Sequence, residues 1–402
     1  MTRHRTGSFI AAVGGVTRLL LPLAALAALT AGGCRSMVAL VVDPALDGPT
    51  RVARDRFKSD LRAAGYKVVE TVSPFADPVA VRGYLQGLPR NRLRGAILIG
   101  DVPRAYQYVE FIPANPEFPA MRDEVISYQF YSDLDGTFAA SPAYVSPGGH
   151  AHSYDVHGGA VDWEIWVGVL PVYEGDHAAT VAAIKRYFAK NHEYRTAGTS
   201  IPRRFLEVNE HLSATTRTEH AVLLAGLQTG PYAWTPWSAA PGAQFFFDSP
   251  PAGLTAAQGY VALRTGAADF FHGAAHGSSG QHGQIDIPWV ESHPVRTVFF
   301  WSDGCSVGDL DRSRNFLTSV LYSPTSDVLV AKGTTNDSGG LGNNTDGSYG
   351  HNVATRMEAG KSLGRALVDH VNVPLIPPWS TDREFHYASV VLLGDPTLGV
   401  AP

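Results

Sequence analysis

The sequence predicts an α/β protein in which a mostly parallel sheet is flanked by helices. Apolar runs such as 37–42 and 95–100 are short, continuous and bounded by Asp or Gly, as is typical of buried parallel strands. Amphipathic segments separate these runs in the rhythm of βαβ units. The 402-residue chain is 45% hydrophobic and 17% charged, which suffices for one large domain or two ordinary ones.

In the first half of the chain we expect helices from Pro49 to a C-cap at Gly65, over 79–88, and after an N-cap at Asp176. The sequence between Pro103 and Gly159 has no regular pattern apart from one short run in which apolar and polar residues alternate. That run lies at 126–130, and the strands expected in this half lie at 37–42, 67–72, 95–100 and 163–169.

A polar break near residue 198 separates this half from a second one with the same rhythm. We therefore predict two related subdomains, at 37–198 and 199–402. In the second, strands are expected at 205–208, 245–247, 270–271, 298–301, 327–332 and 387–393. Helices are expected there at 218–226, 256–264, 314–322 and 351–370.

Residues 1–33 read as an export signal and not as part of the fold. Arg3, Arg5 and Arg18 precede an apolar run over 19–29, which is short for a membrane span, and small residues lead to Cys34. This junction resembles the lipobox of bacterial lipoproteins, although Ala31 stands where Leu is usual. The resemblance implies lipidation of Cys34 and a membrane anchor at the cell envelope. A plain secretory signal and an uncleaved anchor are the alternatives.

The chain has only two cysteines, Cys34 and Cys305, and a formal net charge of −5. The charge gives no argument for nucleic acid as a partner. If Cys34 carries a lipid, Cys305 is the sole thiol of an exported protein, which favours a reactive role. The alternative is a small buried hydrophobic residue, because unbridged cysteines are often buried.

Cys305 and His276 each follow an apolar run, and parallel strands present their carboxyl ends at one edge of a sheet. If the two runs are neighbours, a thiol and an imidazole lie side by side. Such an imidazole lowers the pKa of the thiol and later protonates a leaving amine. The backbone amides of Gly277 and Cys305 are then placed to form an oxyanion hole.

These residues resemble the catalytic core of the gingipain-like cysteine peptidases of the caspase-like clan. Four further motifs stand in that family's order, so that the resemblance covers about 38–400. The two central motifs are Ala275-His276-Gly277-Ser278 and Cys305-Ser306-Val307-Gly308-Asp309. The four further ones are Ile99-Gly100-Asp101, Ser132-Asp133-Leu134-Asp135-Gly136, Ile165-Trp166-Val167-Gly168 with Pro171, and Leu393-Gly394-Asp395-Pro396. The resemblance implies a caspase-like fold, Cys305 as nucleophile and His276 as general acid and base.

The resemblance departs from the family at Ala275, where Gly is usual. It also implies an acidic residue that orients His276, for which Glu210 is the candidate, with Glu207 behind it and a solvated loop role as the alternative. His272 competes with His276, since residues four apart on a strand share a face. The Gly-Ser after His276 favours His276. We expect His282 and His293 to be loop or surface residues.

Two sets of residues could bind a metal ion. His150, His152, Asp155 and His157 are spaced somewhat like the ligands of binuclear zinc hydrolases, but no strand end precedes them, which favours a solvated loop. Asp133 and Asp135 with Gly136 offer oxygens for a structural Ca²⁺, as do Asn343, Asn344 and Asp346. Neither set continues into an EF-hand, so turns are the alternative.

The sequence thus predicts an exported cysteine endopeptidase that acts on polypeptides and requires no cofactor. A binding or scaffold lipoprotein that keeps the fold without turnover is the alternative from another class, and a metal-dependent hydrolase is the third. The best-known relatives cleave after Arg or Lys with the help of an acidic group. The stretch 213–217 that should hold this group carries no carboxylate, which argues against basic specificity.

Overall fold

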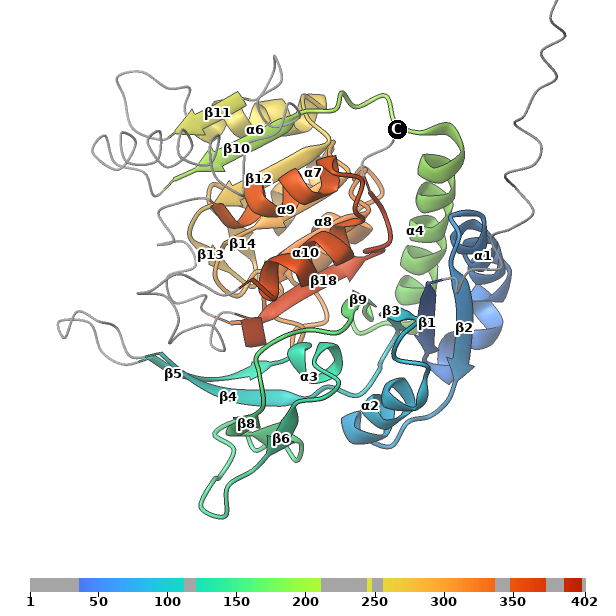
Figure 1. Cartoon of the computed structure of the whole chain (residues 1–402). Helices are drawn as coiled ribbons and strands as arrows, with labels where there is room; N and C mark the ends of the chain where they lie inside the picture. Colours follow the sequence, from blue (N-terminus) through green and yellow to red (C-terminus); the bar gives the residue numbers. More distant parts are fainter. Residues whose placement is uncertain are drawn as a thin grey trace, which may run out of the picture. The chain divides into compact units, whose positions relative to one another are not determined.

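One large β-sheet runs through both halves of the chain in the computed structural model (Figure 1). The structure describes residues 36–111, 121–210, 244–247, 256–336, 348–373 and 387–399. Within these residues the sheet has ten strands. In spatial order they are β11 (Gln244–Phe247), β10 (Phe205–Asn209), β12 (Phe270–Ala274), β16 (Phe299–Ser302), β17 (Val330–Thr334), β18 (Val390–Gly394), β9 (Trp166–Leu170), β3 (Leu93–Ile99), β1 (Met37–Val42) and β2 (Lys67–Val72).

The strand directions divide this sheet into two parallel blocks. Neighbouring strands are parallel throughout except for β17 and β18, which pair antiparallel. Strands β11 to β17 therefore run opposite to strands β18 to β2. The expected boundary near residue 198 falls between the blocks, but β18 comes from the end of the chain and completes the first block. The α/β class with a mostly parallel sheet is as predicted.

Helix α1 (Pro44–Ala63) begins earlier than the sequence predicts. The Asp43 carboxylate caps it by accepting a hydrogen bond of 2.9 Å from the Ala45 N–H, and Pro44 occupies the first turn, where its missing N–H costs nothing. Pro49 lies inside the helix and does not open it. Gly65 follows the end of the helix with a φ of +93°, as expected of a glycine at that place.

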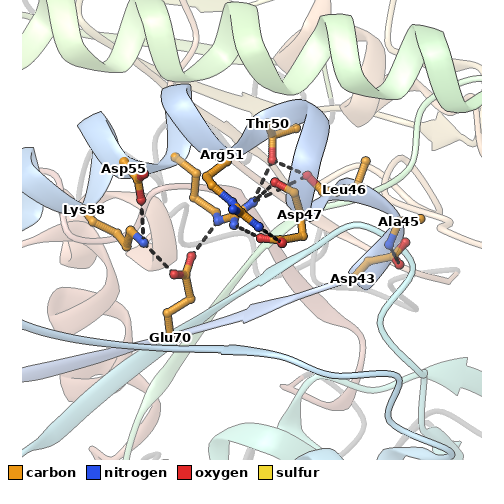
Figure 2. Close-up of polar contacts among 10 residues, drawn as sticks. Asp43, Ala45, Leu46, Asp47, Thr50, Arg51, Asp55, Lys58 and Glu70 are labelled. Carbon is orange, nitrogen blue, oxygen red and sulfur yellow. Dashed lines mark hydrogen bonds and ion pairs between the residues drawn. The ribbon is translucent and has the colours of Figure 1, made fainter.

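Helix α1 is held to strand β2 by polar contacts around Glu70, which Figure 2 shows with Lys58 and Thr50. Arg54 is 1% exposed, and its Nε donates to Glu70 Oε1 at 2.5 Å. Lys58 Nζ reaches the other oxygen of Glu70 at 2.5 Å. On the helix itself, Arg54 Nη1 also donates to Thr50 Oγ1 at 2.9 Å. These bonds satisfy the guanidinium and fix the position of the helix over the edge strand.

The helices pack against one another along the sheet. Helix α1 packs on α4, where the Phe57 and Phe188 rings stack at 4.8 Å, and α4 packs in turn on α8, which contacts α7. Helices α9 and α10 pack together, and α10 contacts β9 (Figure 1). The helices are α2 (Pro78–Gly87), α3 (Gln129–Ser132), α4 (His177–Ala197), α6 (Ala256–Thr265), α7 (Ile287–Ser292), α8 (Phe316–Tyr322), α9 (Ser348–Glu358) and α10 (Leu363–Val371).

One element differs from the prediction in kind. The expected helix over 351–370 is two helices, since Gly360 between them adopts a φ of +86° that ends α9. The short alternating run at 126–130 forms the end of β5 followed by α3. The remaining strands form small sheets: β4 (Tyr106–Phe111), β5 (Met121–Ile126) and β7 (Ser153–Tyr154); β6 (Thr137–Ala139) and β8 (Val156–Gly158); β13 (Gly277–Ser278), β14 (Gln281–His282) and β15 (Ile285–Asp286).

Several expectations fall outside the described residues. They concern the export signal with Cys34, the helix at 218–226, the stretch 213–217, and the oxygen-rich set Asn343, Asn344 and Asp346. Among the residues that are described, no helix is both long and apolar enough to cross a membrane.

Candidate active site

The predicted histidine and cysteine follow two strands that are direct neighbours. Strands β12 and β16 pair in parallel, from Phe270 opposite Phe299 to Gly273 opposite Ser302. His276 follows the first strand and Cys305 the second, so both lie beyond the same edge of the sheet. The core of both strands is aromatic and buried, which fixes the register of the two segments that carry the site.

The backbones of the two segments touch at Gly277. A Cβ atom at this glycine would lie 2.6 Å from the carbonyl oxygen of Cys305 and 2.8 Å from its nitrogen. No side chain other than hydrogen fits there, which is a specific reason for glycine after His276. The contact brings the residue after the imidazole against the backbone of the thiol residue.

The N–H of Gly277 is directed away from the hairpin that it begins. Gly277 pairs with His282 across the hairpin β13–β14, and the N–H of Gly283 donates to the carbonyl of His276 at 2.7 Å. In an antiparallel ladder this bond places the Gly277–His282 pair in the class that exchanges no hydrogen bonds. The Gly277 N–H therefore takes no part in the pairing with His282.

Cys305 sits in a constrained turn. It is a partly buried thiol, and Ser306 after it has a φ of +53°, one of two non-glycine residues with positive φ in the described part of the chain. The Ser306 N–H donates to the Asn336 carbonyl at 2.6 Å, and Thr334 Oγ1 donates to the Gly304 carbonyl at 2.9 Å. Strain of this kind is concentrated at functional sites.

Glu210, the proposed partner of His276, lies beside the same hairpin. Its N–H donates to the Ala274 carbonyl at 2.8 Å, and Tyr260 donates its hydroxyl proton to Glu210 Oε1 at 2.9 Å. The carboxylate also packs against Gly283, where a Cβ would overlap it. Glu210 is thus held next to the residue that bonds to the His276 carbonyl, and His276 itself is exposed.

His272, the competitor of His276, belongs to a buried network on one face of the sheet. It is fully buried, and its Nε2 lies 2.8 Å from Asp303 Oδ2. Glu207 is the residue opposite it on β10, with an oxygen 3.9 Å from His272 Nδ1. Glu207 therefore faces His272 and not the edge of the sheet.

Asp303 and Lys332 complete this network two residues before Cys305 in the sequence and on the neighbouring strand β17. Lys332 Nζ donates to Asp303 Oδ1 at 2.6 Å and to the Ser302 carbonyl at 3.0 Å, and the Trp301 indole donates to Asp303 Oδ1 at 3.0 Å. Burial by itself raises the pKa of Asp303, but Lys332 and His272 more than offset it and lower this pKa below its ordinary value. Asp303 is therefore a carboxylate at neutral pH.

His282 is buried, contrary to the expectation of a loop or surface position. It is 0% exposed, and its ring stacks near Phe316 of α8 and lies edge-on to Phe300. Its Nδ1 lies 2.8 Å from Ser302 Oγ. The expectation failed because the two-residue turn after Ser278 sends the hairpin back over the sheet. His293 remains at the end of α7, where it stacks on Trp289.

The histidine-rich stretch does not converge on one point. His157 Nε2 lies 2.8 Å from Asp133 Oδ2, whereas the His150 ring stacks on Tyr106 with centroids 3.5 Å apart. Asp155 accepts hydrogen bonds from Ser141. His150, Asp155 and His157 thus have different neighbours, and the contacts among the described residues do not support a zinc centre there.

Asp133 and Asp135 lie with a third carboxylate, that of Glu164, which the sequence analysis missed. Among the described residues these three form the one group of at least three metal-ligating side chains whose ligand atoms lie within 4.8 Å of one another. Protein donors already occupy part of the group, because Asp133 accepts from the Gly136 N–H at 2.6 Å and pairs with His157. Calcium at this loop stays a prediction.

Asn336, at the carboxyl end of β17, is another residue that the sequence analysis missed. It is 5% exposed, and within the described part of the chain both polar atoms of its side chain are buried without a hydrogen-bond partner. An orphaned amide beside the thiol turn is unusual in a folded core. The signal available in the sequence was its place after a third strand of the same parallel block.

Comparison with family models, with curated proteins and with solved structures finds no match for this chain. The site is therefore defined by its geometry. It consists of a thiol and an imidazole beyond neighbouring parallel strands, a glycine that contacts the backbone of the thiol residue, and the buried network of Asp303, Lys332 and His272. This combination has the groups needed for nucleophilic attack by sulfur on a carbonyl carbon.

Proposed function

We propose that the protein is an exported cysteine endopeptidase with Cys305 as nucleophile and His276 as general acid and base. The observation that carries this proposal is the contact between Gly277 and the Cys305 backbone beyond strands β12 and β16. That contact brings the residue after His276 against the backbone of Cys305. The caspase-like type of α/β fold is part of the same proposal and is supported by the ordered sequence motifs.

The reaction follows from these groups. His276 takes the proton of the Cys305 thiol, and Sγ attacks the carbonyl carbon of the scissile peptide bond. The negative charge that develops on the carbonyl oxygen is stabilised by the N–H groups of Gly277 and Cys305, each worth about 3 kcal/mol where such donors have been removed. The C–N bond then breaks, and His276 protonates the leaving amine.

Water completes the turnover. His276 accepts a proton from water as the oxygen attacks the thioester, and the Cys305 sulfur leaves and regains its proton. Glu210 is proposed to orient His276, since it is anchored against the hairpin that continues from the histidine. No cofactor takes part in this sequence of steps, and the substrate is a polypeptide.

The test is intact-mass analysis of the mature protein after exposure to a peptide chloromethyl ketone library. Wild type is expected to gain one adduct, located at Cys305, whereas Cys305→Ala gains none and His276→Ala reacts far more slowly. His293→Ala is the matched control and labels like wild type. A thiol that reacts only after denaturation would identify Cys305 as structural. The binding or scaffold function would then replace the enzyme.

Export and a lipid anchor at Cys34 are proposed from the sequence alone. The expected mature chain begins at Cys34 and carries a mass increment of attached acyl chains, which mass spectrometry of the membrane fraction detects. Cys34→Ser should remove this increment. A mature chain that starts elsewhere without added mass would show a plain secretory signal.

A further inference from the structure

The buried His282 connects the two halves of the proposed active site. It lies on the hairpin that begins directly after His276, and its Nδ1 is 2.8 Å from Ser302 Oγ, at the end of the strand that leads to Cys305. Ser302 Oγ in turn accepts a hydrogen bond of 3.1 Å from the Gly304 N–H. A continuous chain of hydrogen bonds therefore runs from the hairpin to the residue before the nucleophile.

The packing around His282 leaves little freedom to this chain. A Cβ at Gly304 would lie 2.8 Å from His282 Nδ1, and one at Gly273 would overlap the other side of the ring. The two ring nitrogens thus contact two glycines, Gly273 on β12 and Gly304 just after β16. Phe316 and Phe300 enclose the rest of the ring. Close contact of this kind transmits a shift of either segment to the other.

The network of Asp303, Lys332 and His272 holds residues 302–304 from the other face of the sheet. Ser302 and Asp303 are consecutive, so their side chains leave the strand toward opposite faces of the sheet. Asp303 binds His272 and Lys332 on the face covered by α9, where Gly350 packs against the His272 ring. Ser302 binds His282 on the face covered by α8. Residues 302–304, which lead to Cys305, are therefore held by contacts on both faces of the sheet.

We propose that His282 is a positioning residue that sets the distance between the Cys305 thiol and the His276 imidazole. The inference rests on the proposed peptidase activity and adds a second histidine to it, one that never touches the substrate. The ring acts through Ser302 and Gly304 on one side and through the hairpin on the other. Its hydrogen bond fixes the register of the Gly277 amide against the Cys305 backbone.

The experiment compares His282→Phe with His282→Asn, Ser302→Ala and the double variant His282→Phe/Ser302→Ala. Phe keeps a ring in the aromatic pocket but loses Nδ1, whereas Asn places a polar atom near the position of Nδ1. We expect His282→Phe to lower kcat between about tenfold and 100-fold with KM nearly unchanged, because a small misplacement of reacting groups has effects of this size. Asn should recover part of the loss.

Two further readouts separate positioning from simple destabilisation. The rate of Cys305 alkylation should fall in His282→Phe, since the imidazole of His276 no longer lies in place to take the proton of the thiol. The double variant should lose no more than the worse single variant, because both remove the same link. His293→Phe, on the end of α7, is the control and should behave as wild type.

The outcomes distinguish this inference from the function on which it rests. If wild-type Cys305 fails to react in the native protein, the proposed peptidase is wrong. Labelling of wild type together with an unchanged alkylation rate and kcat in His282→Phe would overturn the positioning role alone. Should His282→Phe fail to fold, as judged by circular dichroism, Ser302→Ala carries the test, since it breaks the same chain and removes only one oxygen.

Discussion

At Lys332 a single ammonium group keeps a buried carboxylate charged. Lys332 is 1% exposed and Asp303 5%, and their polar atoms lie 2.6 Å apart. Lys332→Met leaves Asp303 buried, with the His272 ring and the Trp301 indole as its polar neighbours. We expect the free energy of unfolding to fall by about 3–5 kcal/mol, the usual cost of removing one member of a buried pair. Chemical denaturation at pH 7 measures it.

The matched control for this substitution is Lys361→Met. Lys361 Nζ lies 2.6 Å from Asp369 Oδ2, but its side chain is 42% exposed, so the pair should contribute less than about 1 kcal/mol. Because the folded pKa of Asp303 is lowered, the stability that the network contributes is present above about pH 4. It should be lost as the pH falls further. Equal losses in both variants would contradict the buried network.

Asp269 gives a pH dependence of the opposite sign. Burial raises its pKa to about 7, although it accepts a hydrogen bond of 2.9 Å from the Arg204 N–H. Between about pH 4 and pH 7 the folded state holds a proton that the unfolded state has lost, so stability falls as the pH rises. Asp269→Asn can keep the hydrogen bond and has no charge. It should therefore exceed wild type in stability at pH 8, by up to about 4 kcal/mol, and match it at pH 4.

Urea unfolding at pH 4, 6 and 8 measures this dependence. Asp286→Asn, at the exposed N-cap of α7, is the control, because Asn caps a helix about as well as Asp. It should retain the wild-type difference between pH 4 and pH 8. If Asp269→Asn also retains that difference, the Asp269 carboxyl group is ionised in the folded protein over the whole range.

The positions of His276 and Cys305 were predictable because each follows a continuous apolar strand, and strand ends are visible in the sequence. The residues that support them were not. His282 and Lys332 take part through contacts across strands, and which strands are neighbours is decided by the whole sheet. The two glutamates could have been distinguished from the sequence alone. Side chains alternate between the two faces along a strand, so Glu207, within the strand, belongs to one face and is directed to His272, whereas Glu210 lies beyond the strand end.

At the scale of the element, helices α9 and α10 show the limit of periodicity. The pattern over 351–370 continues across Gly360, since both helices bury one apolar stripe and their stripes are in phase. The break depends on the φ of +86° at Gly360. Glycine tolerates the interior of a helix as well as its end, so the sequence alone did not decide between the two.

Substitution of two glycines tests this explanation. Gly360 and Gly48 both have open space where a Cβ would be placed. At Gly360 the left-handed backbone makes Gly360→Ala unfavourable by about 1–2 kcal/mol. Gly48 lies within α1, where Gly48→Ala should stabilise by up to about 1 kcal/mol through helix propensity. The midpoint of thermal unfolding should move in opposite directions. A rise for Gly360→Ala would show that α9 and α10 can join into one helix.

At the scale of the whole described chain, β18 joins the two parallel blocks. Leu393 pairs with Ala331 of β17 and with Val169 of β9, so one residue spans the reversal in strand direction. The two-subdomain prediction rested on the repeated rhythm of strands and helices. The local sequence pattern carried no information on where β18 pairs, because its partners lie about 60 and 220 residues away in the sequence.

This arrangement predicts that both blocks unfold together. Leu393 is fully buried, and Leu393→Ala should cost about 2–5 kcal/mol. Because β18 borders both blocks, the substitution should lower the free energy of opening equally for amides in β3 and in β16. Native-state hydrogen exchange measures this free energy. Val52→Ala, at a site that is 87% exposed on α1, should change neither by more than about 0.5 kcal/mol. Loss of protection confined to β16 would instead establish two subdomains that unfold independently, with β18 belonging to the C-terminal one.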